Sequence, residues 1–249
     1  MKLTILVSVL ASHEIVRRQL IYLAGLGLSD DIELLLIDDG SNPPITANGC
    51  GLSNLRIHAT NDCRPWTQQI ARNLGAAMAQ GEYLLCTDID HVLSRQAIET
   101  VRAGQYDVVR FRRELGLLDS NGQFTQDRML LSTWCVPPER LAEGKRLRIS
   151  PHSNSYGIRR DLFIELGGSR VDRNAVYPQR DEIPIKRRIK RLQAEGKISV
   201  IPDELRPTIY MIPNGRYCGD IDSNPFGYFH ALSRKTPANR SWQEEQHAS

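Results

Sequence analysis

The segment ARNLGAAMAQGEYLLCTDIDH, residues 71–91, constrains the fold more than any other part of the 249-residue chain. Apolar residues recur at helical spacing over residues 66–78, so one face of the predicted helix is apolar. Gly81 lies where a helix usually ends, and residues 83–86 form a short apolar run typical of a central parallel strand. Three side chains that can bind a metal follow this strand: Asp88, Asp90 and His91. Because open α/β sheets bind ligands at the carboxyl ends of their strands, an acidic site is expected there.

Asp88 and Asp90 form a D-x-D sequence at this predicted strand end. Two carboxylates two residues apart can both reach a small hard cation where the backbone turns. Mg²⁺ or Mn²⁺ held in this way keeps open positions for the phosphates of a nucleotide. The same sequence also occurs without a metal, in which case Asp88 caps a turn and Asp90 is solvated. Whether these carboxylates bind a metal therefore depends on which other residues lie at the carboxyl edge of the sheet.

The first 40 residues predict a strand–helix–strand unit. Residues 3–9 are rich in β-branched side chains, helical spacing follows over residues 15–26, and residues 33–37 are a second apolar run. Such a unit has parallel strands and is expected to have a right-handed crossover. In a parallel sheet, Asp38 and Asp39, which end the second run, share an edge with the D-x-D pair. A carboxylate there can accept hydrogen bonds from a base or a ribose. Neither a dinucleotide fingerprint nor a P-loop follows the first strand, which disfavours both of those folds.

The remaining segments predict further strands and helices with two long loops. Strands are expected at residues 55–58, 107–111, 154–158 and 197–202, and helices at residues 94–102, 160–166 and 185–194. Residues 112–150 and 211–229 are polar or rich in turn residues, so irregular loops are expected, and such long loops are often functional. The tail from residue 236 is expected to be poorly ordered.

Composition and charge are ordinary for a soluble globular protein, with 41% hydrophobic residues, 24% charged residues and a net charge of +3. The basic residues are clumped, however, and each clump is either a solvated face or a contact for an anionic ligand or polymer. The clumps are Arg110, Arg112 and Arg113; Lys145, Arg146 and Arg148; Arg159 and Arg160; and Lys186, Arg187, Arg188, Lys190 and Arg191.

Cysteine usage and hydropathy indicate a cytoplasmic protein. The five cysteines form no CxxC pair, so neither a zinc site nor a disulfide framework is expected. Residues 3–11 are apolar, but one basic flanking residue and strand-like alternation favour a buried strand over a signal peptide. No apolar run reaches the length of a membrane span, so no transmembrane segment is expected.

Five sequence blocks carry a family resemblance. They are the first strand with Ser8 and Ser12, IDDGS at residues 37–41, ARNLG at residues 71–75, the segment 81–90 with its D-x-D, and residues 157–168. The last block has the pattern G-x-R-R-x-x-F-x-x-x-G-G. In this order the blocks resemble a family 2 glycosyltransferase, over residues 3–95 and in part over residues 152–196.

The resemblance implies the GT-A nucleotide-diphosphosugar transferase fold, which is a Rossmann-like α/β fold. Its mostly parallel central sheet is flanked by helices and joined to an acceptor-side half and a C-terminal loop. One domain is expected over residues 1–235, in which residues 1–95 bind the nucleotide-sugar and residues 96–235 bind the acceptor. A flexible polar tail is expected over residues 236–249.

The resemblance also implies roles for single residues at the donor site. A nucleotide-diphosphate sugar, most simply a UDP-sugar, is the expected donor, and Mn²⁺ or Mg²⁺ bridges its diphosphate. Residues expected to bind the donor are Ser8, Asp38, Asp39, Arg72, Asp88 and Arg234. Asp88 and Asp90 are the expected metal ligands. His230 is a candidate third ligand from the C-terminal loop, and whether His91 or His230 joins the metal stays open.

Asp181 and Glu182 match the place of the family's catalytic base, with Asp181 the first candidate. The base removes the proton of the acceptor hydroxyl in inverting members of the family. Here the pair reads D-E rather than E-D, and its distance to Gly196 is longer than usual. The alternative is that both residues supply favourable negative charge at a helix N-terminus.

The functional prediction is therefore an inverting, metal-dependent transfer of a sugar to an acceptor hydroxyl. The expected acceptor is a glycan, a lipid or a small molecule. The clumped basic residues leave a second possibility, in which the acceptor is a hydroxylated base in DNA. A third possibility is a catalytically inactive module that only binds nucleotide-sugars, although the intact D-x-D argues against it.

Overall fold

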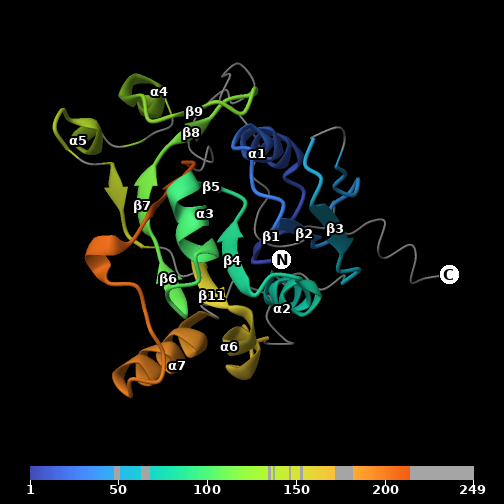
Figure 1. Cartoon of the computed structure of the whole chain (residues 1–249). Helices are drawn as coiled ribbons and strands as arrows, with labels where there is room; N and C mark the ends of the chain where they lie inside the picture. Colours follow the sequence, from blue (N-terminus) through green and yellow to red (C-terminus); the bar gives the residue numbers. More distant parts are fainter. Residues whose placement is uncertain are drawn as a thin grey trace.

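The computed structural model describes residues 1–47, 51–62, 68–133, 136, 138–145, 147–151, 154–171 and 182–213. Its centre is a six-stranded sheet with the order β3-β2-β1-β4-β11-β6 (Figure 1). The strands are β1 (Leu3–Val9), β2 (Ile32–Asp38), β3 (Leu55–Ala59), β4 (Tyr83–Asp88), β6 (Val108–Arg110) and β11 (Tyr156–Arg159). The first four of these are parallel to one another, and β11 runs antiparallel to β4 and β6. The α/β class and the parallel strands of the first half are confirmed.

Helices cover both faces of this sheet because successive strand residues point to opposite sides. Leu3, Ile5 and Val7 of β1 belong to one apolar cluster with α1 (His13–Gly25) and α3 (Arg95–Arg102). Leu6 belongs to a second cluster with the helices of the other face. Those helices are α2 (Gln68–Met78), α6 (Arg160–Glu165) and α7 (Glu182–Ala194).

A smaller four-stranded sheet follows the D-x-D sequence, with the order β10-β7-β12-β5. Its strands are β5 (His91–Leu93), β7 (Arg112–Leu115), β10 (Arg148–Ile149) and β12 (Thr208–Met211). Nearby lie the hairpin of β8 (Leu117–Leu118) and β9 (Phe124–Thr125), and the short helices α4 (Arg128–Ser132) and α5 (Pro138–Leu141). A single turn of 3-10 helix, η1 (Asp203–Leu205), precedes β12.

Two expectations from the sequence are wrong. Residues 112–150 are not an irregular loop, because they contain β7 to β10, α4 and α5. These strands are only two to four residues long, and β7 and β10 pair with segments far away in the sequence, so they leave no local periodicity. The strand expected at residues 197–202 is also wrong, since Val200 forms only an isolated bridge with Val108.

A loop was expected to begin at residue 211, but Met211 is the last residue of β12, so the loop begins one residue later. Residues 214–249, which include most of this loop and the tail, lie outside the described residues. None of the helices that the structure describes is both long and apolar enough to cross a membrane.

Gly81 does not cap α2, which ends at Met78. Its backbone N–H instead donates to Thr4 Oγ1 at 2.9 Å, so Gly81 packs directly against the start of β1. A Cβ atom at Gly81 would lie 2.4 Å from the backbone nitrogen of Thr4 and 2.6 Å from the carbonyl carbon of Leu3. Only a residue without a side chain fits between α2 and β4 here.

Gly81→Ala is therefore expected to lower the free energy of unfolding by about 1–3 kcal/mol, because the clash is with backbone atoms that cannot rotate away. Urea unfolding followed by circular dichroism measures this loss. Gly25→Ala is the matched control, because no atom lies within 4 Å of the added Cβ at the end of α1. Equal stability of the two variants would contradict the packing role of Gly81.

Candidate functional site

The strand ends of the central sheet bring the predicted donor residues to one edge. β1 lies between β2 and β4, so Ser8 is paired in register with Ile37 on one side and with Asp88 on the other. Asp38 is paired with Val9. With a strand spacing of about 4.8 Å, the two acidic strand ends lie roughly 10 Å apart across β1. The parallel strands therefore bring both acidic strand ends to the same edge of the sheet.

Asp88 is held in place by three side chains from two sides. Its Oδ1 accepts hydrogen bonds from Gln68 Nε2 at 2.9 Å and from Arg72 at 3.1 Å, and its Oδ2 accepts from Asn154 Nδ2 at 3.3 Å. Arg72 is buried, whereas the Asp88 side chain is 18% exposed. Arg72 therefore contacts the D-x-D carboxylate directly, and its charge compensates the cost of burying an anion.

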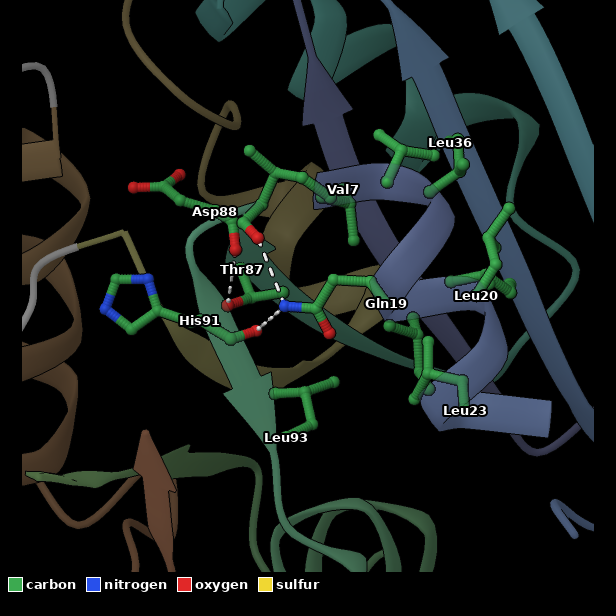
Figure 2. A pocket seen from close by; sticks show the side chains of 13 residues that line it. Val7, Gln19, Leu20, Leu23, Leu36, Thr87, Asp88, His91 and Leu93 are labelled. Carbon is green, nitrogen blue, oxygen red and sulfur yellow. Dashed lines mark hydrogen bonds between the residues drawn. The ribbon is translucent and has the colours of Figure 1, made fainter. Parts of the chain in front are cut away.

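The turn between Asp88 and His91 is fixed through its backbone. The buried Gln19 of α1 donates from Nε2 to the carbonyls of Ile89 and His91, both at 3.1 Å (Figure 2). The carbonyl of Asp90 accepts from the backbone N–H of Ile212 at 2.8 Å. The carbonyls of residues 89–91 thus accept hydrogen bonds from α1 and from the residue that follows β12. These bonds restrict the directions that the Asp90 side chain can take.

His91 connects Asp90 to the second sheet. Its Nδ1 lies 2.7 Å from Asp90 Oδ1, and its Nε2 accepts a hydrogen bond from Arg113 at 3.3 Å. A guanidinium can only donate, so Nε2 is the acceptor in this contact, and Nδ1 is the ring atom next to Asp90. Burial lowers the pKa of the Arg113 guanidinium, and the charges of Asp90 and Asp88 offset part of that shift. Arg113 therefore lies within electrostatic reach of both carboxylates.

Asp88, Asp90 and His91 are the group in the described part of the chain that can hold a metal ion, with one ligand atom from each within 4.8 Å of the others. Two partly exposed carboxylates fit a hard cation such as Mg²⁺ or Mn²⁺. His91 is buried, and both of its ring nitrogens face neighbouring side chains. The ring is placed to orient the Asp90 carboxylate.

Asp38 and Asp39 differ in what their carboxylates bind. Both oxygens of Asp38 accept from backbone N–H groups of the following loop, from Ser41 and from Ile45, each at 2.8 Å. Asp39 Oδ1 accepts from the hydroxyl of Thr60 at 3.0 Å. Asp38 therefore shapes the loop, and Asp39 is the better placed of the two to face a base.

Ser8 contributes a buried hydroxyl to the same edge. Its Oγ has no hydrogen-bond partner among the residues that the structure describes. A buried hydroxyl without a partner is costly, so a ligand that bonds to it gains affinity. This observation fits the donor-binding role expected for Ser8.

Several predicted residues lie outside the described residues. They are Asp181, His230 and Arg234, together with the side chain of Glu182. The backbone of Glu182 is placed, since it is the first residue of α7. The roles predicted for these residues stay predictions.

The structure adds four residues that the sequence interpretation missed: Gln19, Gln68, Arg113 and Asn154. Only Gln19 left a signal, because it is a polar residue in the apolar stripe between Ile15 and Leu23 of α1. A cavity of about 20 Å³ lies beside it in the apolar core behind the turn (Figure 2). That cavity holds no more than a water molecule, so it is not a substrate site.

The comparison with protein families decides the identity of this fold and site. The model described as "Glycosyl transferase family 2" matches residues 10–166, which is more than half of the chain. The chain belongs to glycosyl transferase family 2. The matched region of this transferase contains both acidic strand ends, the Arg72 helix and the block at residues 157–166.

The transferase is similar to several solved structures. Staphylococcus aureus TarS (residues 1–349) in complex with UDP-GlcNAc has 17% identity and a TM-score of 0.50, covering 85% of this chain and 58% of TarS. Full TarS has 14% identity and a TM-score of 0.46, covering 87% and 38%. Mycobacterium tuberculosis glucosyl-3-phosphoglycerate synthase in complex with phosphoglyceric acid has 12% identity and a TM-score of 0.44, covering 85% and 70%.

The transferase spans between 38% and 62% of the length of the TarS structures. None of the curated protein sequences that were compared matches it. The family match and the shared architecture confirm the predicted GT-A fold and the predicted enzyme class, a glycosyltransferase.

Proposed function

We propose that the transferase moves a sugar from a nucleotide-diphosphate sugar to an acceptor hydroxyl, with inversion at the sugar carbon and with a bound divalent cation. The observation that carries this proposal is the restrained pair Asp88 and Asp90 at the carboxyl edge of the sheet, one strand from the Ser8 hydroxyl, which has no partner among the described residues. A solvated acidic pair without a ligand would not need hydrogen-bond donors such as Gln68, Arg72 and Asn154 around it.

The donor lies across the ends of β2, β1 and β4 in this proposal. Asp39 accepts hydrogen bonds from the base, with Asp38 shaping the loop beneath it. Ser8 and Arg72 contact the nucleotide near Asp88, and Arg234 contacts the diphosphate. The complex of TarS with UDP-GlcNAc makes UDP-sugars the first donors to test.

Asp90 and Asp88 would hold Mn²⁺ or Mg²⁺, and His230 is the proposed third ligand. When bound, the cation supplies Lewis-acid stabilisation of the negative charge on the departing nucleoside diphosphate. His91 is a positioning residue in this scheme, because it contacts Asp90 Oδ1 from the side of the second sheet.

The chemical step forms one bond and breaks one at the anomeric carbon. The acceptor oxygen attacks this carbon from the face opposite the diphosphate, and the bond from carbon to phosphate oxygen breaks. Asp181, or Glu182 at the start of α7, takes the proton of the acceptor hydroxyl. The nucleoside diphosphate leaves with the bonding electron pair.

The acceptor is proposed to be a glycan, a lipid or a small molecule. The comparisons give no support to a DNA acceptor, and two of the clumped arginines already have partners within the fold. Arg112 donates to the carbonyls of Asp203 and Glu204, and Arg159 forms ion pairs with Asp107 and Asp161. These two arginines therefore bind partners within the protein, which argues against a role in binding a polyanion.

Two further assignments belong to the same proposal. Residues 1–95 would bind the donor and residues 96–235 the acceptor, within one domain. A cytoplasmic setting stays a prediction, and Cys86, the cysteine that the structure describes, is buried.

Donor binding is tested by thermal unfolding with UDP, GDP, CDP, ADP and dTDP, each with and without Mn²⁺. We expect one of them to raise the melting temperature only when Mn²⁺ is present, because the cation joins the two carboxylates to the diphosphate. Donor turnover with the matching nucleotide-sugar then checks activity. If none of the five nucleotides shifts the melting temperature in Mn²⁺, the donor site is refuted.

A further inference from the structure

A second cavity lies at the same edge of the central sheet, next to the D-x-D strand but on the side away from Ser8. Its volume is about 420 Å³, which is in the range of small-molecule sites. Its walls come from the end of β6, the residues before and within β11, and the first half of α7. Five of the lining side chains are cationic: Arg110, Lys186, Arg187, Lys190 and Arg206. None of the described residues that line it is acidic.

Arg110 and Arg206 form the most unusual part of this lining. Arg110 is half-buried, and its guanidinium makes no hydrogen bond or ion pair with any described residue, although it lies within electrostatic reach of Arg206. Burial lowers the pKa of the Arg110 guanidinium, the charge of Arg206 lowers it further, and Asp203 offsets part of this shift. Arg206 pairs with the exposed Asp203, and its buried Nε has no partner in the described part of the chain.

Two like charges that are partly removed from water destabilise each other, and a bound anion would relieve this repulsion. A guanidinium pair also matches the geometry of a phosphate or carboxylate group. The three basic residues of α7 that line the cavity, Lys186, Arg187 and Lys190, add positive charge around the same space, so the cavity as a whole attracts an anion.

The cavity is joined to the proposed reaction centre by consecutive residues. Asn154 donates to Asp88, and the hydroxyl of Ser155 lies 3.2 Å from that of Thr87. Tyr156 is paired in register with Cys86 of β4 and with Arg110 of β6. Arg110 is therefore two strand spacings, roughly 10 Å, from the strand that carries the D-x-D.

We infer that this cavity binds a phosphate or carboxylate group of the acceptor, so the acceptor is an anionic hydroxyl compound. This inference rests on the proposed function, because it names the acceptor class for the same site. The hydroxyl that receives the sugar would face Asp88 and the start of α7, while the anionic group lies between Arg110 and Arg206. The short span between them indicates that only a few bonds separate the hydroxyl from the anionic group.

The test is calorimetric binding of matched probes to the full chain: glycerol 1-phosphate, glycerate and uncharged glycerol. We expect the charged probes to bind at least about tenfold more tightly than glycerol. The reason is that a hydrogen bond to a charged group contributes more binding free energy than one between neutral groups. Vesicles of phosphatidylglycerol, compared with phosphatidylcholine, distinguish a lipid headgroup from a free small acceptor. Preference for either anionic probe supports the inference, and equal binding of charged and uncharged probes overturns it.

Variants separate a specific site from general positive charge. Arg110→Gln and Arg187→Gln are expected to weaken binding of glycerol 1-phosphate by about tenfold, and Arg110→Lys by less. Arg191→Gln is the matched control, since Arg191 has the same charge, belongs to the same helix as Arg187 and faces Glu195 outside the cavity lining. Equal losses in Arg187→Gln and Arg191→Gln would overturn the site, and the exposed Arg187 keeps the test valid if Arg110→Gln folds poorly.

Binding of UDP with Mn²⁺ to the same variants separates this inference from the proposed function. If wild type binds UDP but shows no preference for the anionic probes, the inference fails and the donor site stands. If the anion binds through Arg110 and no nucleotide binds, the proposed function fails while the anion site remains.

Discussion

Asp90→Ala is expected to reduce sugar transfer by about a thousandfold, because a bound cation contributes several kcal/mol to stabilising the departing diphosphate. Asp90 is one of the two partly exposed carboxylates of the D-x-D turn, and its backbone carbonyl accepts a hydrogen bond from the N–H of Ile212. The measurement is release of the nucleoside diphosphate from the nucleotide-sugar over a series of Mn²⁺ concentrations. The variant should also lose the Mn²⁺-dependent rise in melting temperature that the nucleotide produces.

Asp30→Ala is the control for this experiment, since it removes an exposed carboxylate far from the carboxyl edge of the sheet. It should keep the activity and the metal response of the wild type. Full activity of Asp90→Ala in the absence of metal would refute the metal-dependent mechanism. A loss of activity that extra Mn²⁺ restores would show weakened metal binding and support it.

The second large effect on the transfer rate is expected when the proposed catalytic base is removed. One of the two variants Asp181→Ala and Glu182→Ala should lose about 10²–10⁴-fold in transfer rate, with binding of the nucleotide and Mn²⁺ unchanged. Single-turnover kinetics with saturating donor measure the step directly. The variant that leaves the rate nearly unchanged identifies the other residue as the base.

The alternative role makes a different prediction for the same variants. If Asp181 and Glu182 only supply negative charge at the start of α7, each change costs about 0.3–1 kcal/mol of stability and the rate is unaffected. A thermal unfolding curve beside each rate measurement therefore distinguishes the two roles. Two variants that are destabilised but fully active would rule out this pair as the source of the base.

The position of the D-x-D sequence was predictable from local pattern, but the state of its side chains was not. An apolar run bounded by turn residues is enough to place Asp88 at a strand end. That Asp88 binds Gln68 and Asn154 depends on segments 20 and 66 residues away. Contacts over such distances leave no periodicity in the sequence.

For His91, too, the position was predictable from the sequence and the contacts of the side chain were not. Its place beside the acidic pair was visible in the sequence and raised the question of metal binding. The structure shows it buried between Asp90 and Arg113, because β5 joins a second sheet through β12. The segment that contains Arg113 was expected to be a loop, so this contact could not be predicted.

The sequence by itself determined the α/β class, the parallel strands of the first half and the carboxyl edge that carries Asp38, Asp39, Asp88 and Asp90. Apolar periodicity and turn residues encode these features locally, and parallel strands align their ends. Only the tertiary structure decided which donors hold Asp88, that Asp38 shapes its own loop, and that Arg110 and Arg206 face one cavity. These features arise where short strands and side chains distant in sequence meet, and burial there sets the charge and hydrogen bonding of each group.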